Sequence, residues 1–125
     1  FSFSIFLINI YNWNQHISPF FVVLLLWYPC YENLFSILRK NILKRSPMYP
    51  DAKHMHQLTF FYVKKKYNLT IFSANTLTAQ IINIYNLMVF TLGLNFIANT
   101  KIQILLILFN VVIYTLVYFK FFKFR

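Results

Sequence analysis

Acidic residues are almost absent from this chain of 125 residues, which has two, Glu32 and Asp51, against twelve lysines and arginines. Two carboxylates cannot supply a magnesium-dependent phosphoryl-transfer centre, which needs several of them to hold the ion. The single glycine, Gly93, excludes a glycine-rich phosphate loop. The single cysteine, Cys30, excludes an intrachain disulfide. No nucleophilic triad or paired carboxylates can be assembled either.

Apolar residues dominate what is present. They make up 59% of the chain, aromatic residues make up 22%, and only 11% of the residues are charged. These values exceed what an ordinary soluble domain of this length shows, so they predict an integral membrane protein. A net charge of +10 would suggest nucleic acid in a soluble protein. Here the cations lie beside apolar segments, where they set orientation and meet anionic lipid, and we expect no nucleic-acid binding.

The apolar segments predict an all-α, polytopic membrane helix bundle with about three full transmembrane helices and a partial N-terminal one. A helix needs about 20 residues to cross the hydrocarbon layer. The expected full spans are 17–38, 75–98 and 102–119, and the partial span is 1–11. Ser18 and Pro19 suit a helix start, and Pro29 is expected to bend the first full span. We expect the chain to be the C-terminal part of a larger membrane protein.

A basic connector is expected between the first two full spans, over 39–74. It holds eight of the twelve cations, three more lie at the C-terminus, and Lys101 lies in the opposite turn. The positive-inside rule therefore predicts that the connector and the C-terminus are cytoplasmic. Within it, residues 57–66 are expected to form a helix along the membrane surface, with Leu58, Phe61 and Tyr62 on its apolar face.

Polar side chains recur inside the predicted spans. Gln80, Asn83 and Asn86 are spaced by three and would share one stripe of a helix. They are expected to hydrogen-bond to neighbouring helices, with a polar lining as the alternative. Glu32 is an ionisable group at membrane depth, so it is expected either to pair with Ser36 or Arg39 or to support a functional site.

The connector also carries the residues best suited to chemistry. His54 and His56 flank a methionine, with Lys53 and Asp51 just before them. Histidines two apart point to one side only where the backbone is not regular helix, and Asp51 is suited to cap a helix that begins beyond it. Imidazole and ammonium groups donate to phosphate oxygens, which favours an anionic ligand. Solvated structural histidines remain open, and so does a metal, although a closed zinc site wants four ligands.

A set of short motifs resembles the C-terminal part of the polyprenyl-phosphate N-acetylhexosamine-1-phosphate transferases, and most closely their undecaprenyl-phosphate GlcNAc-1-phosphate branch. The motifs are Tyr28-Pro29, Glu32 to Ile37, Arg39-Lys40, Ser46-Pro47, Pro50-Asp51-Ala52 and His54 to Leu58. They cover roughly residues 18 to 66; beyond these, only the two closing spans and the basic tail agree.

This resemblance implies a role for the connector. His54 and His56 would contact the diphosphate or the sugar of a UDP-sugar, Asp51 would order the loop, and Lys53 would add charge. Gln57, also expected to bind substrate, stands where many members carry a further histidine. Glu32 and Arg39 would not contact the substrate but would help to position the residues that do.

The resemblance further implies Mg²⁺, held by residues upstream of this chain, and no metal ligand within it. The implied partners are a UDP-sugar, undecaprenyl phosphate and membrane lipid, with a homodimer left open. The implied location is the bacterial inner membrane, where the whole enzyme would start the synthesis of a cell-envelope polysaccharide. Two other classes stay open. A transporter or channel would use Glu32 and the amide stripe as a path, and a non-catalytic anchor would hold anionic lipid through the basic connector.

Overall fold

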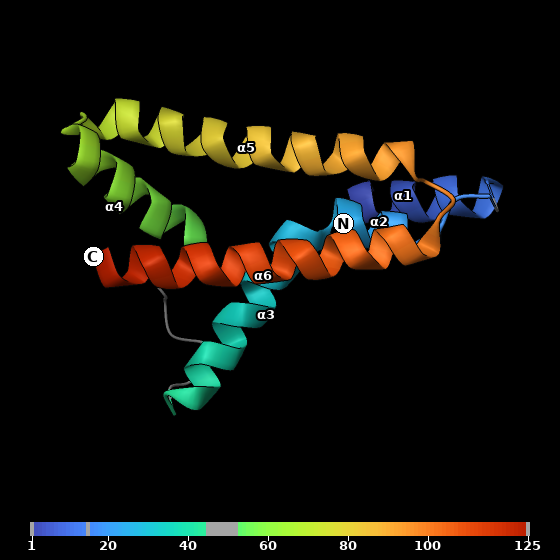
Figure 1. The fold of residues 1–125 in the computed structure, drawn as a ribbon, viewed down its shortest axis with the longest axis horizontal. Coiled ribbons are helices and arrows are strands. Elements are labelled where there is room, and N and C mark those ends of the chain that lie inside the picture. Colours follow the sequence, from blue (N-terminus) through green and yellow to red (C-terminus); the bar gives the residue numbers. More distant parts are fainter. Residues whose placement is uncertain (1, 15, 45–52, 125) are drawn as a thin grey trace.

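The structure is a computed structural model that describes residues 2–14, 16–44 and 53–124. In these ranges it contains six α-helices and no strand, which confirms the predicted all-α class. The helices are α1 (Ser2–Trp13), α2 (Pro19–Leu25), α3 (Trp27–Ile42), α4 (Met55–Tyr67), α5 (Ile71–Asn95) and α6 (Thr100–Phe124). In Figure 1, α5 and α6 run the length of the molecule, and α2 and α4 lie between them at opposite ends.

Two helices, α5 and α6, are each long and apolar enough to cross a membrane. Each helix has 25 residues. α5 begins before the expected span 75–98 and ends before residue 98, and α6 extends beyond both ends of the expected span 102–119. α5 begins early because Thr70 caps it: the Thr70 hydroxyl accepts a hydrogen bond from the backbone N–H of Ser73 at 3.2 Å. These two apolar helices indicate a membrane-embedded protein.

The first predicted span, 17–38, is a broken helix rather than one bent helix. α2 and α3 meet at Leu26 at an angle of 70°, and only the pair together would make a third span. Pro29 explains the break. Proline has no N–H to donate to the carbonyl of Leu25, four residues earlier, and its ring clashes with that carbonyl. Regular helical hydrogen bonding is therefore interrupted at this point. The break therefore falls at Leu26, ahead of the proline.

The predicted start of this span is confirmed. Ser18 caps α2 by accepting a hydrogen bond from the N–H of Phe20 at 3.3 Å, and Pro19 occupies the first helical position. The Ser18 hydroxyl also lies 3.0 Å from that of Thr100, and its N–H donates to the carbonyl of Ile97 at 2.9 Å. These bonds tie the start of α2 to the turn between α5 and α6.

The prediction of one loop over 39–74 is wrong in part, since α3 extends to Ile42, α4 fills residues 55–67 and α5 begins at Ile71. The expected surface helix exists, but it is packed against α5 and α6. Its buried residues are Met55, Leu58, Thr59 and Val63, whereas Phe61, expected on the apolar face, is exposed. α4 therefore belongs to the bundle.

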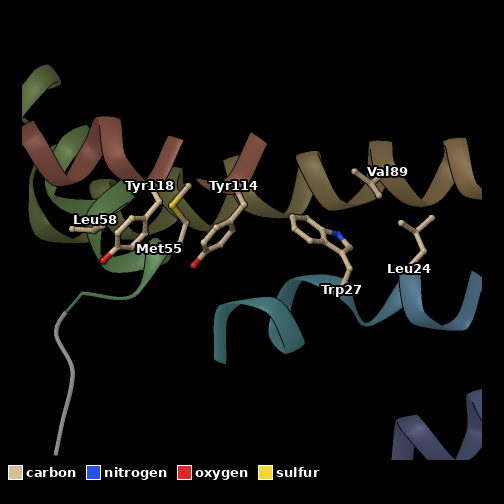
Figure 2. Packing of buried hydrophobic residues seen from close by; sticks show 7 residues of the cluster. All are labelled: Leu24, Trp27, Met55, Leu58, Val89, Tyr114 and Tyr118. Carbon is tan, nitrogen blue, oxygen red and sulfur yellow. The ribbon is translucent and has the colours of Figure 1, made fainter. Parts of the chain in front are cut away.

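Aromatic rings form much of the core around α3, α4 and α6. Figure 2 shows the buried cluster of Leu24, Trp27, Met55, Leu58, Val89, Tyr114 and Tyr118. Tyr114 and Tyr118 stack with ring centroids 6.3 Å apart, and Phe35 from α3 packs edge-on against Tyr118 at 4.7 Å. Such pairs contribute about 0.5–1.5 kcal/mol each beyond burial. They hold α3 against α6 near the start of α4.

Further polar contacts inside the bundle come from residues that the sequence did not single out. Gln103 donates to the carbonyls of Gly93 and Phe96, at 2.8 and 2.9 Å, and Asn110 accepts a hydrogen bond from Tyr85. Of the predicted stripe, Gln80 and Asn83 are exposed on α5. The Oδ1 atom of Asn86 is buried with no hydrogen-bond partner among the described residues. The expectation that this stripe joins helices stays a prediction.

Candidate functional site

The two connector histidines lie where the chain enters α4. His54 is the N-cap, with φ −71° and ψ 153°, so its backbone is extended, while His56 lies in the first helical turn. This mixed geometry brings their rings together, with centroids 5.7 Å apart and planes 14° from parallel. The N-cap is His54 rather than Asp51, which the sequence analysis proposed as a cap; Asp51 itself lies outside the described residues.

Gln57 orders this turn. Its side-chain oxygen accepts a hydrogen bond from the backbone N–H of His54 at 3.2 Å. This is the contact that a glutamine at the third helical position makes in a capping box. Gln57 therefore holds His54 in place in this structure, whereas the resemblance assigned it to the substrate.

Glu32 joins the histidines from α3. Its Oε1 atom lies 3.3 Å from Nδ1 of His56 and 3.8 Å from Nδ1 of His54. The Glu32 side chain is 11% exposed and that of His56 is 54% exposed. The buried carboxylate orients both imidazoles, because each ring turns Nδ1 toward the same oxygen. Glu32 thus supports the histidines, as the sequence analysis allowed.

The surroundings disfavour charge on His54. Burial lowers the pKa of His54 below its usual value, and His56, Arg39 and Lys40 lower it further. Glu32 opposes them without outweighing them. At neutral pH the site therefore presents His54 as a neutral imidazole.

Arg39 and Tyr118 hold the residue that precedes the histidines. Arg39 Nη1 donates to the carbonyl of Lys53 at 2.8 Å and contacts the hydroxyl of Tyr118. The Tyr118 hydroxyl also donates to the Lys53 carbonyl, at 3.1 Å. The guanidinium lies 5.4 Å from the centroid of the Tyr118 ring, and Lys53 Nζ lies 5.2 Å from that of Phe122. Residues from α3 and α6 therefore converge on one backbone carbonyl and fix the approach to α4.

A half-open cavity of about 440 Å³ lies beside His56, between α4 and α5. Its lining residues are His56, Gln57, Phe60, Phe61, Asn75, Thr78, Ala79 and Ile82. Sequence reasoning missed Asn75 and Thr78, because nothing in the local pattern of α5 shows that the first turns of α4 pack beside them. The cavity gives a ligand at His56 room to extend along α5.

Comparison of the chain with family models, with curated proteins and with solved structures finds no match. The residues themselves therefore carry the functional argument.

The described residues do not fit Mg²⁺. They include no group of three histidines, cysteines or carboxylates placed to hold a metal ion. Glu32 is the one carboxylate among them, and two imidazoles face it, whereas Mg²⁺ takes oxygen ligands in octahedral geometry. We derive no step through a metal from this chain.

Proposed function

We propose that this chain is part of a membrane transferase that moves a sugar 1-phosphate, GlcNAc-1-phosphate, from a UDP-sugar to undecaprenyl phosphate. The observation that carries the proposal is the paired, Glu32-anchored arrangement of His54 and His56 at the entry to α4. Support comes from the resemblance of the surrounding motifs and from the two long apolar helices.

The reaction is an exchange at one phosphorus atom. An oxygen of the lipid phosphate attacks the phosphorus that bears the sugar. The bond from that phosphorus to the oxygen bridging it to the uridine-bearing phosphate then breaks. UMP leaves with the electron pair, and the product is a lipid diphosphate that carries the sugar. Negative charge grows on the leaving oxygen, so positioned donors at this point would accelerate the exchange.

The tautomer of His56 decides what it can donate. A carboxylate only accepts hydrogen bonds, so Nδ1 of His56 carries the proton that faces Glu32. The outer nitrogen, Nε2, then donates to a diphosphate only when the ring is protonated. We assign His56 to the diphosphate and His54, neutral at pH 7, to the sugar side of the substrate. Lys53 adds positive charge nearby.

The location follows from the same proposal. The cations of residues 39–66 and of the C-terminus, through the positive-inside rule, support a cytoplasmic position for this end of the bundle, and we assign it to the bacterial inner membrane. The whole enzyme would begin the synthesis of a cell-envelope polysaccharide there, with Mg²⁺ bound by other parts of the protein.

Turnover of labelled UDP-GlcNAc in membranes that contain the full-length protein tests this function. His54→Ala and His56→Ala should each lower turnover at low UDP-sugar concentration by at least tenfold, since removing one positioned donor costs about a hundredfold or more in comparable sites. His16→Ala is the matched control, because His16 is exposed and precedes α2. Normal turnover in both connector variants would refute the proposal, as would an intact gene that encodes no aspartate-rich loops.

A further inference from the structure

Three consecutive lysines end α4, and aromatic rings hold them. Lys64 Nζ lies 5.9 Å from the ring centroid of Phe60, and Lys65 Nζ lies 5.3 Å from that of Phe124 on α6. Lys66 Nζ lies 5.4 Å from the Tyr62 ring. Cation–π contacts of this kind order otherwise mobile ammonium groups. The lysines therefore form a positioned cluster.

Two of these lysines line a second cavity, the α4–α6 pocket. It has a volume of about 350 Å³ and is half open. Its wall includes Leu58, Tyr62, Lys64, Lys65, Phe121 and Phe124. Tyr62 and Phe121, both in this wall, stack directly on each other with centroids 4.4 Å apart. The pocket is thus lined both by cationic side chains and by apolar and aromatic ones.

Positive charge in this region has no acidic counterpart nearby in the sequence. The two acidic residues of the whole chain are Glu32 and Asp51, so residues 52–125 contain none. The Tyr62 hydroxyl, which hydrogen-bonds to Lys66, raises the pKa of that ammonium, and Tyr67 adds to the effect. This effect favours the charged form of Lys66 at physiological pH.

The helix lengths place the pocket at headgroup depth. α5 and α6 have 25 residues each, or about 37 Å of helix, whereas the hydrocarbon layer is about 30 Å thick. The last turn of α6 supplies Phe121 and Phe124, and α5 begins soon after the lysines. In Figure 1, the C-terminal end of α6 and the α4–α5 junction lie at the same end of the molecule.

Lysines in a last helical turn also offset the negative end of the helix dipole, and that role alone needs no ligand. It does not explain why Lys64 and Lys65 line a cavity whose floor is apolar. A ligand with an anionic head and a hydrocarbon body matches both features.

We propose that the α4–α6 pocket binds an anionic phospholipid of the surrounding bilayer. Lys64 and Lys65 contact its phosphate, and Phe121 and Phe124 contact its first acyl carbons. This site is independent of the proposed transferase site, because it uses the opposite end of α4 from His54 and His56.

Lipid retention in nanodiscs tests the site. The 125-residue chain is reconstituted in phosphatidylcholine with a minority of phosphatidylglycerol, and native mass spectrometry counts the phosphatidylglycerol that stays bound. The double variant Lys64→Gln, Lys65→Gln should lose about tenfold or more in phosphatidylglycerol retention, since each lysine near an anionic surface contributes about 1 kcal/mol. Phe124→Ala, which keeps the charge, should also weaken retention.

The matched control removes the same charge elsewhere. Lys44→Gln with Lys101→Gln should retain phosphatidylglycerol as the unchanged protein does, and circular dichroism should show equal helicity in every variant. An equal loss of phosphatidylglycerol retention in the two double variants would show that retention depends only on the net charge of the protein, and this would overturn the proposal. Full retention in the Lys64 and Lys65 variant would overturn it as well. Displacement of the lipid by millimolar inorganic phosphate, or by equimolar undecaprenyl phosphate, would show that the pocket prefers another phosphate ligand and would overturn the assignment to a bilayer phospholipid.

Discussion

Oε1 of Glu32 lies 3.3 Å from Nδ1 of His56, although 24 residues separate them in the chain. Glu32→Gln keeps an acceptor at this point and removes its charge. Charge-assisted hydrogen bonds are roughly twice as strong as neutral ones, so we expect kcat/KM for UDP-GlcNAc to fall about tenfold. Steady-state assays on the full-length protein in membranes measure this change.

A second measurement separates this effect from a general loss of structure. Glu32 raises the pKa of His54 against the lowering by burial, so removing its charge should lower that pKa further and move the pH profile of kcat/KM to lower pH. Asn33→Gln, at an exposed neighbour on the same helix, should leave the profile in place. An unmoved profile in Glu32→Gln would show that the carboxylate does not act through the imidazoles.

Protonation of His54 should make the protein less stable in acid. The folded-state pKa of His54 is lowered, chiefly by burial, so the unfolded chain binds the proton more readily. The stability that this histidine contributes is complete above the unfolded pKa of about 6.5. It is lost as the pH falls from there through the folded pKa.

Thermal unfolding in detergent at pH 5 and pH 7.5 measures this dependence. The difference in Tm between the two pH values should be smaller for His54→Gln than for the unchanged protein. His16→Gln, which changes an exposed histidine, should show the full difference. An identical pH dependence in His54→Gln would contradict the assigned role of burial.

Long apolar segments made much of this fold predictable. α5 and α6 follow from runs of apolar residues, and the start of α2 follows from Ser18 and Pro19. These features depend on residues adjacent in the chain. The position of the break at Leu26 also has a local cause in Pro29, but the angle of 70° depends on what α3 packs against.

Contacts between distant segments were not predictable. Residue types pointed to His54 and His56, but their contact with Glu32 depends on tertiary structure. It requires α3 to turn away from the axis of α2 and the start of α4 to lie close to Glu32. The packing of α4 was also hidden. Its buried residues, Met55, Leu58, Thr59 and Val63, recur at spacings of three and four, and the apolar face of a surface helix has the same spacing. Tyr118 lies 65 residues from Lys53 and gives no sequence signal at all.

Tyr118→Phe should loosen the approach to the histidines. The change removes the hydroxyl that donates to the Lys53 carbonyl at 3.1 Å and that accepts a hydrogen bond from Arg39, and it leaves the Arg39 contact to the same carbonyl. We expect a loss of about 1–3 kcal/mol in the free energy of unfolding, typical of two hydrogen bonds. Unfolding by denaturant in detergent measures it.

Tyr31→Phe serves as the matched control for this prediction. It removes another hydroxyl between α3 and α6, which lies 3.0 Å from that of Thr115. Both variants should lose stability, Tyr31→Phe by the smaller amount, but only Tyr118→Phe should raise the KM for UDP-GlcNAc. Equal KM values in the two variants would show that the Lys53 carbonyl contact does not position the site.

Gly93→Ala should force α2 and α5 apart. A Cβ atom at residue 93 would lie 2.6 Å from Cδ2 of Leu24 and 3.4 Å from Cε2 of Phe21. Leu24 is fully buried, so its side chain has no space into which to turn. Overpacking of this kind costs about 1–3 kcal/mol, which denaturant unfolding in detergent can resolve.

The double variant with Leu24→Ala decides whether this contact is the cause. Leu24→Ala alone should cost about 2–5 kcal/mol through the cavity that it leaves. In the double variant the new methyl group of residue 93 occupies part of that cavity, so the two losses should sum to more than the measured total. Additive losses would place the cost of Gly93→Ala elsewhere, in the hydrogen bond from Gln103 to the Gly93 carbonyl, and Gln103→Leu would then reproduce it.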